Sequence, residues 1–218
     1  MTEPLDALIM TLGFEPGPLI RAVASHNLKP GSSIIILTPV FDGKREERGE
    51  RAYLELERIC SMMLGEANIT VKRVDIELTD LTLAINQVKE LLSNYVLKYV
   101  AISLSGGMRA LCLATYIAYL LVKWEKTPLI EIQLEGRAES LEVPPLHTIL
   151  TLDISEERKN ILKVLLEKGP LTIADIAPLV QKDRSTVYRH LTSLTKLNLV
   201  QQRGRFYELT SLGKIIAK

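Results

Sequence analysis

The residue types best suited to binding an anion gather in one short stretch, Ser103–Arg109, between a predicted strand and a predicted helix. Consecutive glycines at Gly106 and Gly107 allow backbone N–H groups to approach a ligand closely, and a helix start adds donors and a favourable dipole. The Ser105 hydroxyl and the Arg109 guanidinium extend this donor set towards a phosphate. The alternative is a tight strand-to-helix turn that needs glycine for its geometry alone, with Arg109 at the surface.

A second loop, Thr11–Gly17, follows the first predicted strand. Gly13 and Phe14 can bring backbone and an aromatic face near a base, although Phe14 equally suits a place in the core. The loop lacks the G-x-G-x-x-G spacing of dinucleotide-binding turns, so a nicotinamide site is not expected.

A third group of polar and basic side chains forms the outward face of a helix predicted over Arg184–Leu197. Its members are Arg184, Ser185, Thr186, Tyr188, Arg189 and Ser193. Side chains of these types near a helix start reach base edges and phosphates in the major groove of DNA. Arg203 and Arg205 flank Gly204 in a predicted hairpin turn and suit phosphate or minor-groove contacts. The pattern predicts DNA binding; the alternative is a winged helix that contacts proteins.

The elements that must position the two loops alternate between strand and helix over residues 1–143. Strands are predicted over Leu5–Thr11, Ser32–Thr38, Ile69–Asp75, Lys98–Leu104 and Pro128–Leu134, and helices over Pro16–Asn27, Lys44–Leu64, Leu78–Tyr95 and Gly107–Trp124. Mostly apolar strands indicate a doubly wound parallel sheet with helices on both faces. In the order 3-2-1-4-5, strands one and four are neighbours and both loops lie where such sheets bind ligands. Ala138–Val143 would add an antiparallel edge strand.

The remaining residues follow the order helix–helix–helix–hairpin–helix. The predicted segments are Ser155–Lys168, Ile173–Val180, Arg184–Leu197, Leu199–Gln202 paired with Phe206–Leu209, and Thr210–Ala217. Pro144 and Pro145 stop regular structure before them. We therefore divide the chain into a Rossmann-like α/β domain (1–143), a linker (144–153) and a winged helix-turn-helix domain (154–218).

Charge differs between the two parts. Residues 153–218 carry 12 Lys+Arg against 7 Asp+Glu, whereas residues 1–152 carry 15 against 19. A small basic domain beside a mildly acidic one favours a phosphate-backbone partner. No signal peptide or long apolar span is evident, and Cys60 and Cys112 suit buried free thiols, so we expect a cytoplasmic protein.

The stretch TIADIAPLVQKDRSTVYRHLTSLTKLNLV (172–200) resembles the winged helix-turn-helix of MarR- and ArsR-like regulators. Together with LGF (12–14) and SLSGGMRAL (103–111), it makes nearly the whole chain resemble CARF-domain proteins. The likeness is to the archaeal CRISPR-associated transcriptional regulators, which act in antiviral defence and carry a CARF sensor and a MarR-like winged helix.

The resemblance implies a homodimeric sensor that binds a cyclic oligoadenylate, commonly cyclic tetra-adenylate, across its two-fold axis. Carried over to this sequence, the lining is Thr11, Leu12, Gly13, Phe14, Ser103, Ser105, Gly106, Gly107, Met108 and Arg109. Lys44–Arg51 would be a mobile loop closing over the ligand, or a solvated helix start. The paired winged helices would bind double-stranded DNA; no metal, further cofactor or catalytic residue is expected.

Two alternatives stay open. Some CARF proteins cleave their cyclic RNA, which requires in-line attack by a ribose 2′-OH and stabilisation of the developing charge. Arg109 and Ser105 offer weak help there, while His26, at the end of the first helix, and His147, in the linker, are not expected near either loop. The second alternative is a regulator that responds to a different small molecule.

Overall fold

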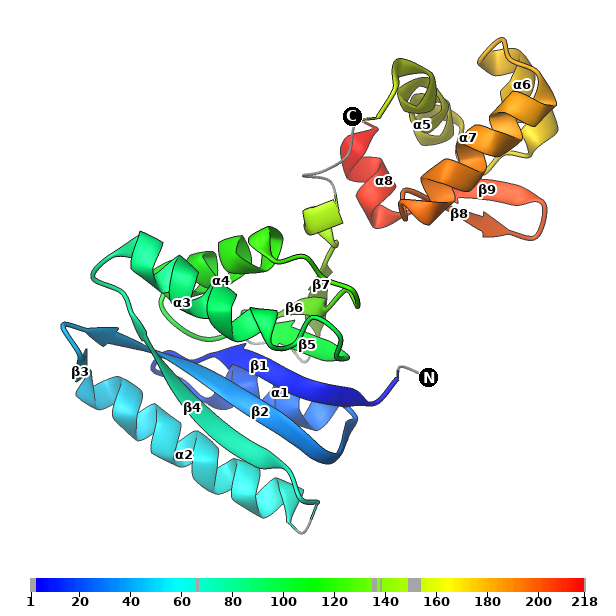
Figure 1. The fold of residues 1–218 in the computed structure, drawn as a ribbon. Coiled ribbons are helices and arrows are strands. Elements are labelled where there is room, and N and C mark those ends of the chain that lie inside the picture. The colour runs from blue at the N-terminus through cyan, green and yellow to red at the C-terminus, as the bar shows by residue number, and fades with distance from the viewer. Residues whose placement is uncertain (1–2, 66, 135–136, 138, 149–153, 218) are drawn as a thin grey trace. The chain divides into compact units, whose positions relative to one another are not determined.

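The chain folds into two compact units in a computed structural model that describes residues 3–65, 67–134, 137, 139–148 and 154–217 (Figure 1). The first unit ends at Pro145 and the second begins at Leu146. Of the predicted linker, residues 149–153 lie outside the described residues, and Leu146–Thr148 form a 3-10 helix.

The first unit is built on one mainly parallel sheet. Its strands are β1 (Leu5–Thr11), β2 (Leu28–Phe41), β3 (Lys44–Arg45), β4 (Thr70–Glu77), β5 (Val100–Ser103), β6 (Leu129–Gln133) and β7 (Ser140–Val143). The parallel strands lie in the order β4-β2-β1-β5-β6, which confirms the predicted 3-2-1-4-5 order, and β7 pairs antiparallel with β6 at the edge. Ala138, where the predicted edge strand began, is outside the described residues.

Helices cover both faces of this sheet, as the apolar strands predicted. They are α1 (Gly17–Ser25), α2 (Glu47–Leu64), α3 (Leu81–Ser93) and α4 (Arg109–Leu121). Because side chains alternate along a strand, Ile34 and Ile36 of β2 pack with α1 and α2, whereas Ile35 and Leu37 pack with α3 and α4 (Figure 1). The α/β fold class is therefore confirmed.

The predicted helix start at Lys44 is three residues too early, and of the two interpretations of Lys44–Arg51, the solvated helix start agrees with the exposed first turn of α2, whereas the mobile loop does not. β2 continues to Phe41, and Asp42 (φ 50°) and Gly43 (φ 70°) then turn the chain in the left-handed region. Asp-Gly favours this two-residue hairpin turn, so the next two residues, 44 and 45, pair back onto β2 as β3. α2 begins only at Glu47, and the segment is therefore a short strand followed by a helical turn.

The second unit has the predicted order of elements. It contains α5 (Glu156–Lys168), α6 (Ile173–Leu179), α7 (Arg184–Lys196), β8 (Val200–Arg203), β9 (Phe206–Leu209) and α8 (Ser211–Ile216). Its core includes Leu162, Ile176, Val187 and Leu191, which face one another from three helices. No helix in the described part of the chain has the length and apolar character needed to span a membrane.

Candidate functional site

The two predicted ligand loops leave the sheet at the same edge. β1 and β5 are parallel neighbours, with Met10 opposite Ser103. The segment Leu12–Pro16, called here the first loop, follows β1, and Leu104–Met108, called the glycine loop, follows β5. Because parallel strands end together, the sheet brings these two distant sequence segments side by side.

Glycine is required where the two loops pack against each other. A Cβ atom on Gly13 would lie 2.7 Å from both the N and the Cα atom of Gly107. A Cβ atom on Gly106 would lie 2.7 Å from the carbonyl oxygen of Thr11, and Gly107 has a φ of +105°. Both distances are well below normal contact, so the loops form one continuous backbone surface that side chains would separate.

Buried side chains hold this surface from below. The Thr11 hydroxyl donates to the carbonyl oxygen of Gly106, and the Cys112 thiol lies 3.2 Å from the same oxygen. Burial raises the pKa of Cys112, which keeps the thiol protonated and able to donate. The prediction that Cys60 and Cys112 are free thiols is consistent with this structure, although only Cys60 is fully buried.

Burial divides the ten predicted ligand residues into two groups. Thr11, Leu12, Gly13 and Ser103 are buried, so a ligand at the surface would not reach the side chains of Thr11, Leu12 or Ser103. In this structure these side chains lie beneath the loop surface and support it, which differs from their predicted role as ligand lining. The members with surface exposure are Phe14, Ser105, Gly106, Gly107, Met108 and Arg109.

The start of α4 has the features of an anion site. Its N-cap residue, Met108, has no side-chain oxygen to cap the helix, and its first turn contains no acidic residue. Uncapped N–H groups and the positive end of the helix dipole favour a negatively charged ligand. Arg109 is exposed at this position and adds a full positive charge.

A buried polar chain beside the glycine loop was missed by the sequence analysis. His26 Nε2 lies 3.2 Å from Glu131 Oε1, Gln133 Nε2 lies 3.2 Å from the same oxygen, and the Gln133 backbone N–H donates to Ser105 Oγ at 2.8 Å. His26, which was not expected near either loop, is therefore linked to Ser105 indirectly, through the Glu131 side chain and then through Gln133, whose backbone N–H makes the last contact. The sequence did offer a signal, because Glu131 and Gln133 are polar residues in a strand that is otherwise apolar.

The Glu131 carboxylate is charged in this chain of contacts. Burial acts to raise its pKa, but the contacts with His26 and Gln133 outweigh burial and leave the pKa below its ordinary value. Ser105 Oγ also lies 2.6 Å from Ser103 Oγ. The Ser105 hydroxyl is therefore engaged inside the protein and orients the loop.

In the second unit, a shallow groove runs between α6, α7 and the hairpin. The residues that line it are Thr172, Ile173, Ala174, Arg184, Ser185, Tyr188, Gln202, Arg205 and Tyr207. Four of the eight predicted DNA-contacting residues therefore lie together in this groove: Arg184, Ser185, Tyr188 and Arg205. Arg189 is exposed outside this lining, Ser193 is half-buried, and Arg203 Nε lies 2.7 Å from Glu208 Oε1.

Asp183 determines the orientation of two hydroxyls at the start of α7. Ser185 Oγ donates to Asp183 Oδ1 at 2.5 Å, and Thr186 Oγ1 donates to Asp183 Oδ2 at 2.8 Å. These hydrogen bonds hold the pKa of Asp183 far below its usual value. Because both hydroxyl hydrogens are used, the two oxygens can only accept further hydrogen bonds.

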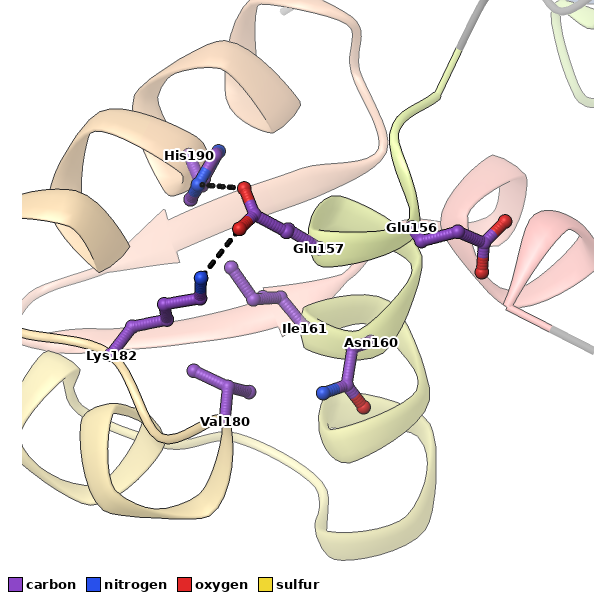
Figure 2. A pocket seen from close by; sticks show the side chains of 7 residues that line it. All are labelled: Glu156, Glu157, Asn160, Ile161, Val180, Lys182 and His190. Atoms are coloured by element: carbon purple, nitrogen blue, oxygen red, sulfur yellow. Dashed lines mark hydrogen bonds and ion pairs between the residues drawn. The ribbon is translucent and has the colours of Figure 1, made fainter.

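His190 is packed behind the exposed face of α7, as predicted. Its side chain is 12% exposed and its Nε2 lies 3.3 Å from Glu157 Oε2 of α5. Figure 2 shows Glu157 between His190 and Lys182, whose Nζ donates to Glu157 Oε1 at 2.5 Å. The three residues fasten α7 and the turn before it to α5. Within the described ranges, no three His, Cys, Asp or Glu side chains are grouped as metal ligands.

Family comparisons match both units. Residues 6–144 match the Csa3 CRISPR-associated Rossmann-like domain, and residues 147–218 match the HVO_A0261 N-terminal domain. The chain is 25% identical over 98% of its length to Csa3 of Saccharolobus solfataricus, covering 88% of that protein. It is 30% identical over 89% of its length to Csa3 of Thermoproteus tenax, covering 85% of that protein. Both relatives are named as CRISPR locus-related candidate DNA-binding proteins.

Among solved structures, similarity is distant. Can2 from Sulfobacillus thermosulfidooxidans, in complex with cyclic tetra-adenylate, is 12% identical with a TM-score of 0.43, covering 97% of this chain and 61% of its own. Csm6 from Enterococcus italicus, bound to a cyclic hexa-nucleotide, is 10% identical with a TM-score of 0.49, covering 89% of this chain and 55% of its own. The domain match over more than half of the chain and the Csa3 relatives show that this chain belongs to the Csa3 family of CRISPR-associated proteins.

Proposed function

We propose that this chain is a transcriptional regulator of CRISPR loci that binds a cyclic oligoadenylate through its first unit and double-stranded DNA through its second. The packing of the first loop on the glycine loop is the observation that carries the ligand proposal. Beside this contact, the partly exposed backbone of Gly106 and Gly107 adjoins an uncapped helix start and the exposed Arg109. A phosphate group of a cyclic tetra-adenylate suits that combination of charge and N–H donors.

A homodimer is part of the proposal because α4 carries an unpartnered apolar stripe. Ala110, Leu113 and Leu121 are exposed along one side of this helix, and Ile117 between them is half-buried. The stripe begins next to Arg109, so a second copy packed on it would bring two glycine loops together around a two-fold axis. A cyclic ligand with two-fold symmetry fits such an interface, in which both copies use the same surface.

The DNA proposal rests on the groove of the second unit and on the family relatives. Residues 153–218 carry 12 Lys+Arg against 7 Asp+Glu. Arg184, Tyr188 and Arg205 line a groove formed by a helix start and a hairpin, the elements that enter the grooves of DNA in winged helices. Since the Ser185 and Thr186 oxygens can only accept, they suit the amino groups of adenine and cytosine better than phosphates.

The test is DNA binding with and without the ligand. Duplexes selected from a random pool by the full chain would be titrated in fluorescence anisotropy, with and without cyclic tetra-adenylate. The proposal expects the ligand to change DNA affinity at least several-fold, and expects Arg109→Ala to abolish that change while leaving ligand-free DNA binding intact. Equal affinity under both conditions would contradict ligand-dependent regulation, and linear products recovered from the mixture would instead favour cleavage of the ring.

A further inference from the structure

An exposed guanidinium lies over the face of an exposed aromatic ring beside the glycine loop. Phe14 of the first loop is 39% exposed, and Arg48 Cζ lies 4.9 Å from the centre of its ring. Over the described ranges, no carboxylate lies within ion-pair distance of Arg48. The planar group of Arg48 is thus held by the ring alone, and the pair faces solvent.

The helical turn that carries Arg48 is firmly anchored. Arg73 of β4 has a side chain that is only 11% exposed, and its Nη1 donates to Glu50 Oε2 of α2 at 2.8 Å. The Arg73 guanidinium also lies 4.5 Å from the ring centre of Tyr53, and its Nε lies 3.1 Å from Asp75 Oδ1. These contacts fix the start of α2 on the sheet, while the Arg48 side chain itself is exposed.

We propose that Phe14 and Arg48 form a clamp that stacks on both faces of an adenine base of the ligand. The base enters between ring and guanidinium, and Arg48 closes on its outer face. Aromatic rings and arginine planes are the side chains on which nucleobases stack. Phe14 follows Gly13 directly, and Gly13 touches Gly107, so a phosphate on the glycine loop leaves its neighbouring base near the ring. This clamp rests on the proposed function.

The test compares the affinity of cyclic tetra-adenylate for the full chain and its variants by calorimetry. Phe14→Ala and Arg48→Ala should each weaken binding about tenfold, and the double variant little more, because the two side chains hold one base. Arg48→Lys should bind the ligand as weakly as Arg48→Ala does, because an ammonium group has no flat face to stack. Arg51→Ala is the matched control, since Arg51 is exposed on the same helix and pairs with Glu47 at 3.5 Å; its affinity should stay at the wild-type value.

Fluorescence gives a second readout that distinguishes stacking from general damage. The fluorescence of a cyclic tetra-adenylate that carries 2-aminopurine should be quenched when it binds the unaltered chain. The quenching should be weaker when the same ligand is bound by a saturating concentration of Phe14→Ala. Wild-type affinity in Arg48→Lys would overturn the clamp, because charge alone would then suffice. Wild-type affinity in Arg48→Ala, with binding still lost in Arg109→Ala, would overturn the clamp and leave the proposed function standing. No binding by the unaltered chain would overturn both.

Discussion

Gly13→Ala should force apart the two loops that form the proposed ligand surface. The new Cβ atom would lie 2.7 Å from the N and the Cα atom of Gly107, whereas carbon atoms in contact prefer about 3.5–4.0 Å. One loop must therefore move by roughly 1 Å. Both atoms it meets belong to the backbone, so no flexible side chain can give way. Overpacking of this kind costs about 1–3 kcal/mol, which corresponds to a drop in melting temperature of roughly 2–12 °C for a chain of this size.

The assay is thermal unfolding followed by calorimetric titration with cyclic tetra-adenylate. Gly17→Ala is the matched control, because its nearest neighbour would be Arg21 Nη1 at 3.9 Å, an ordinary contact. We expect Gly13→Ala to lower both the melting temperature and the ligand affinity, and Gly17→Ala to change neither by much. An unchanged melting temperature in Gly13→Ala, or an equal drop in Gly17→Ala, would refute the reasoning from the loop contact.

Three further predictions concern separate parts of the chain. Arg189→Ala should weaken DNA binding by about 5- to 150-fold in anisotropy titrations and leave oligoadenylate affinity unchanged; equal loss of both would contradict the division of roles. Arg205→Ala should reduce the slope of log affinity against log salt by about one, and Arg203→Ala should reduce it less, because Glu208 already pairs with Arg203; identical slopes would argue against a hairpin contact. Glu131→Gln should lower the melting temperature near neutral pH, because the charged carboxylate contacts His26 and has a pKa below its ordinary 4.5. That stabilisation is present above the unfolded pKa and is lost as the pH falls through the lower folded pKa, so the gap between variant and wild type should close in acid. A gap that persists there would show that the carboxylate charge is not its source.

Periodicity and loop chemistry predicted most of the fold. Apolar runs such as those of β1 and β5 indicated strands buried on both faces, and the two loops after them were expected at one sheet edge because parallel strands end together. The hairpin before α2 was missed because the charged residues that follow Asp42-Gly43 also suit an exposed helix, and the turn signal was outweighed.

The candidate site was only partly predictable because burial and side-chain partners depend on tertiary packing. Thr11 and Ser103 are the last residues of the two strands that lead into these loops, and their side chains are buried beneath the loop surface. The contact of Arg48 with Phe14 joins residues 34 positions apart in sequence, through a helix start that long-range contacts of Arg73 fix in place. No local sequence pattern could have predicted that Phe14, Arg48 and Arg73 belong to one part of the structure.

The most direct test of the ligand site is a calorimetric titration of the full chain with cyclic tetra-adenylate, with linear tetra-adenylate as the control. Saturable binding of one ring per two chains, lost in Arg109→Ala, is the predicted result, because the uncapped start of α4 and its arginine would meet across the dimer axis. Absence of heat with the cyclic ligand, or undiminished binding by Arg109→Ala, would contradict the assignment of the glycine loop as the ligand site.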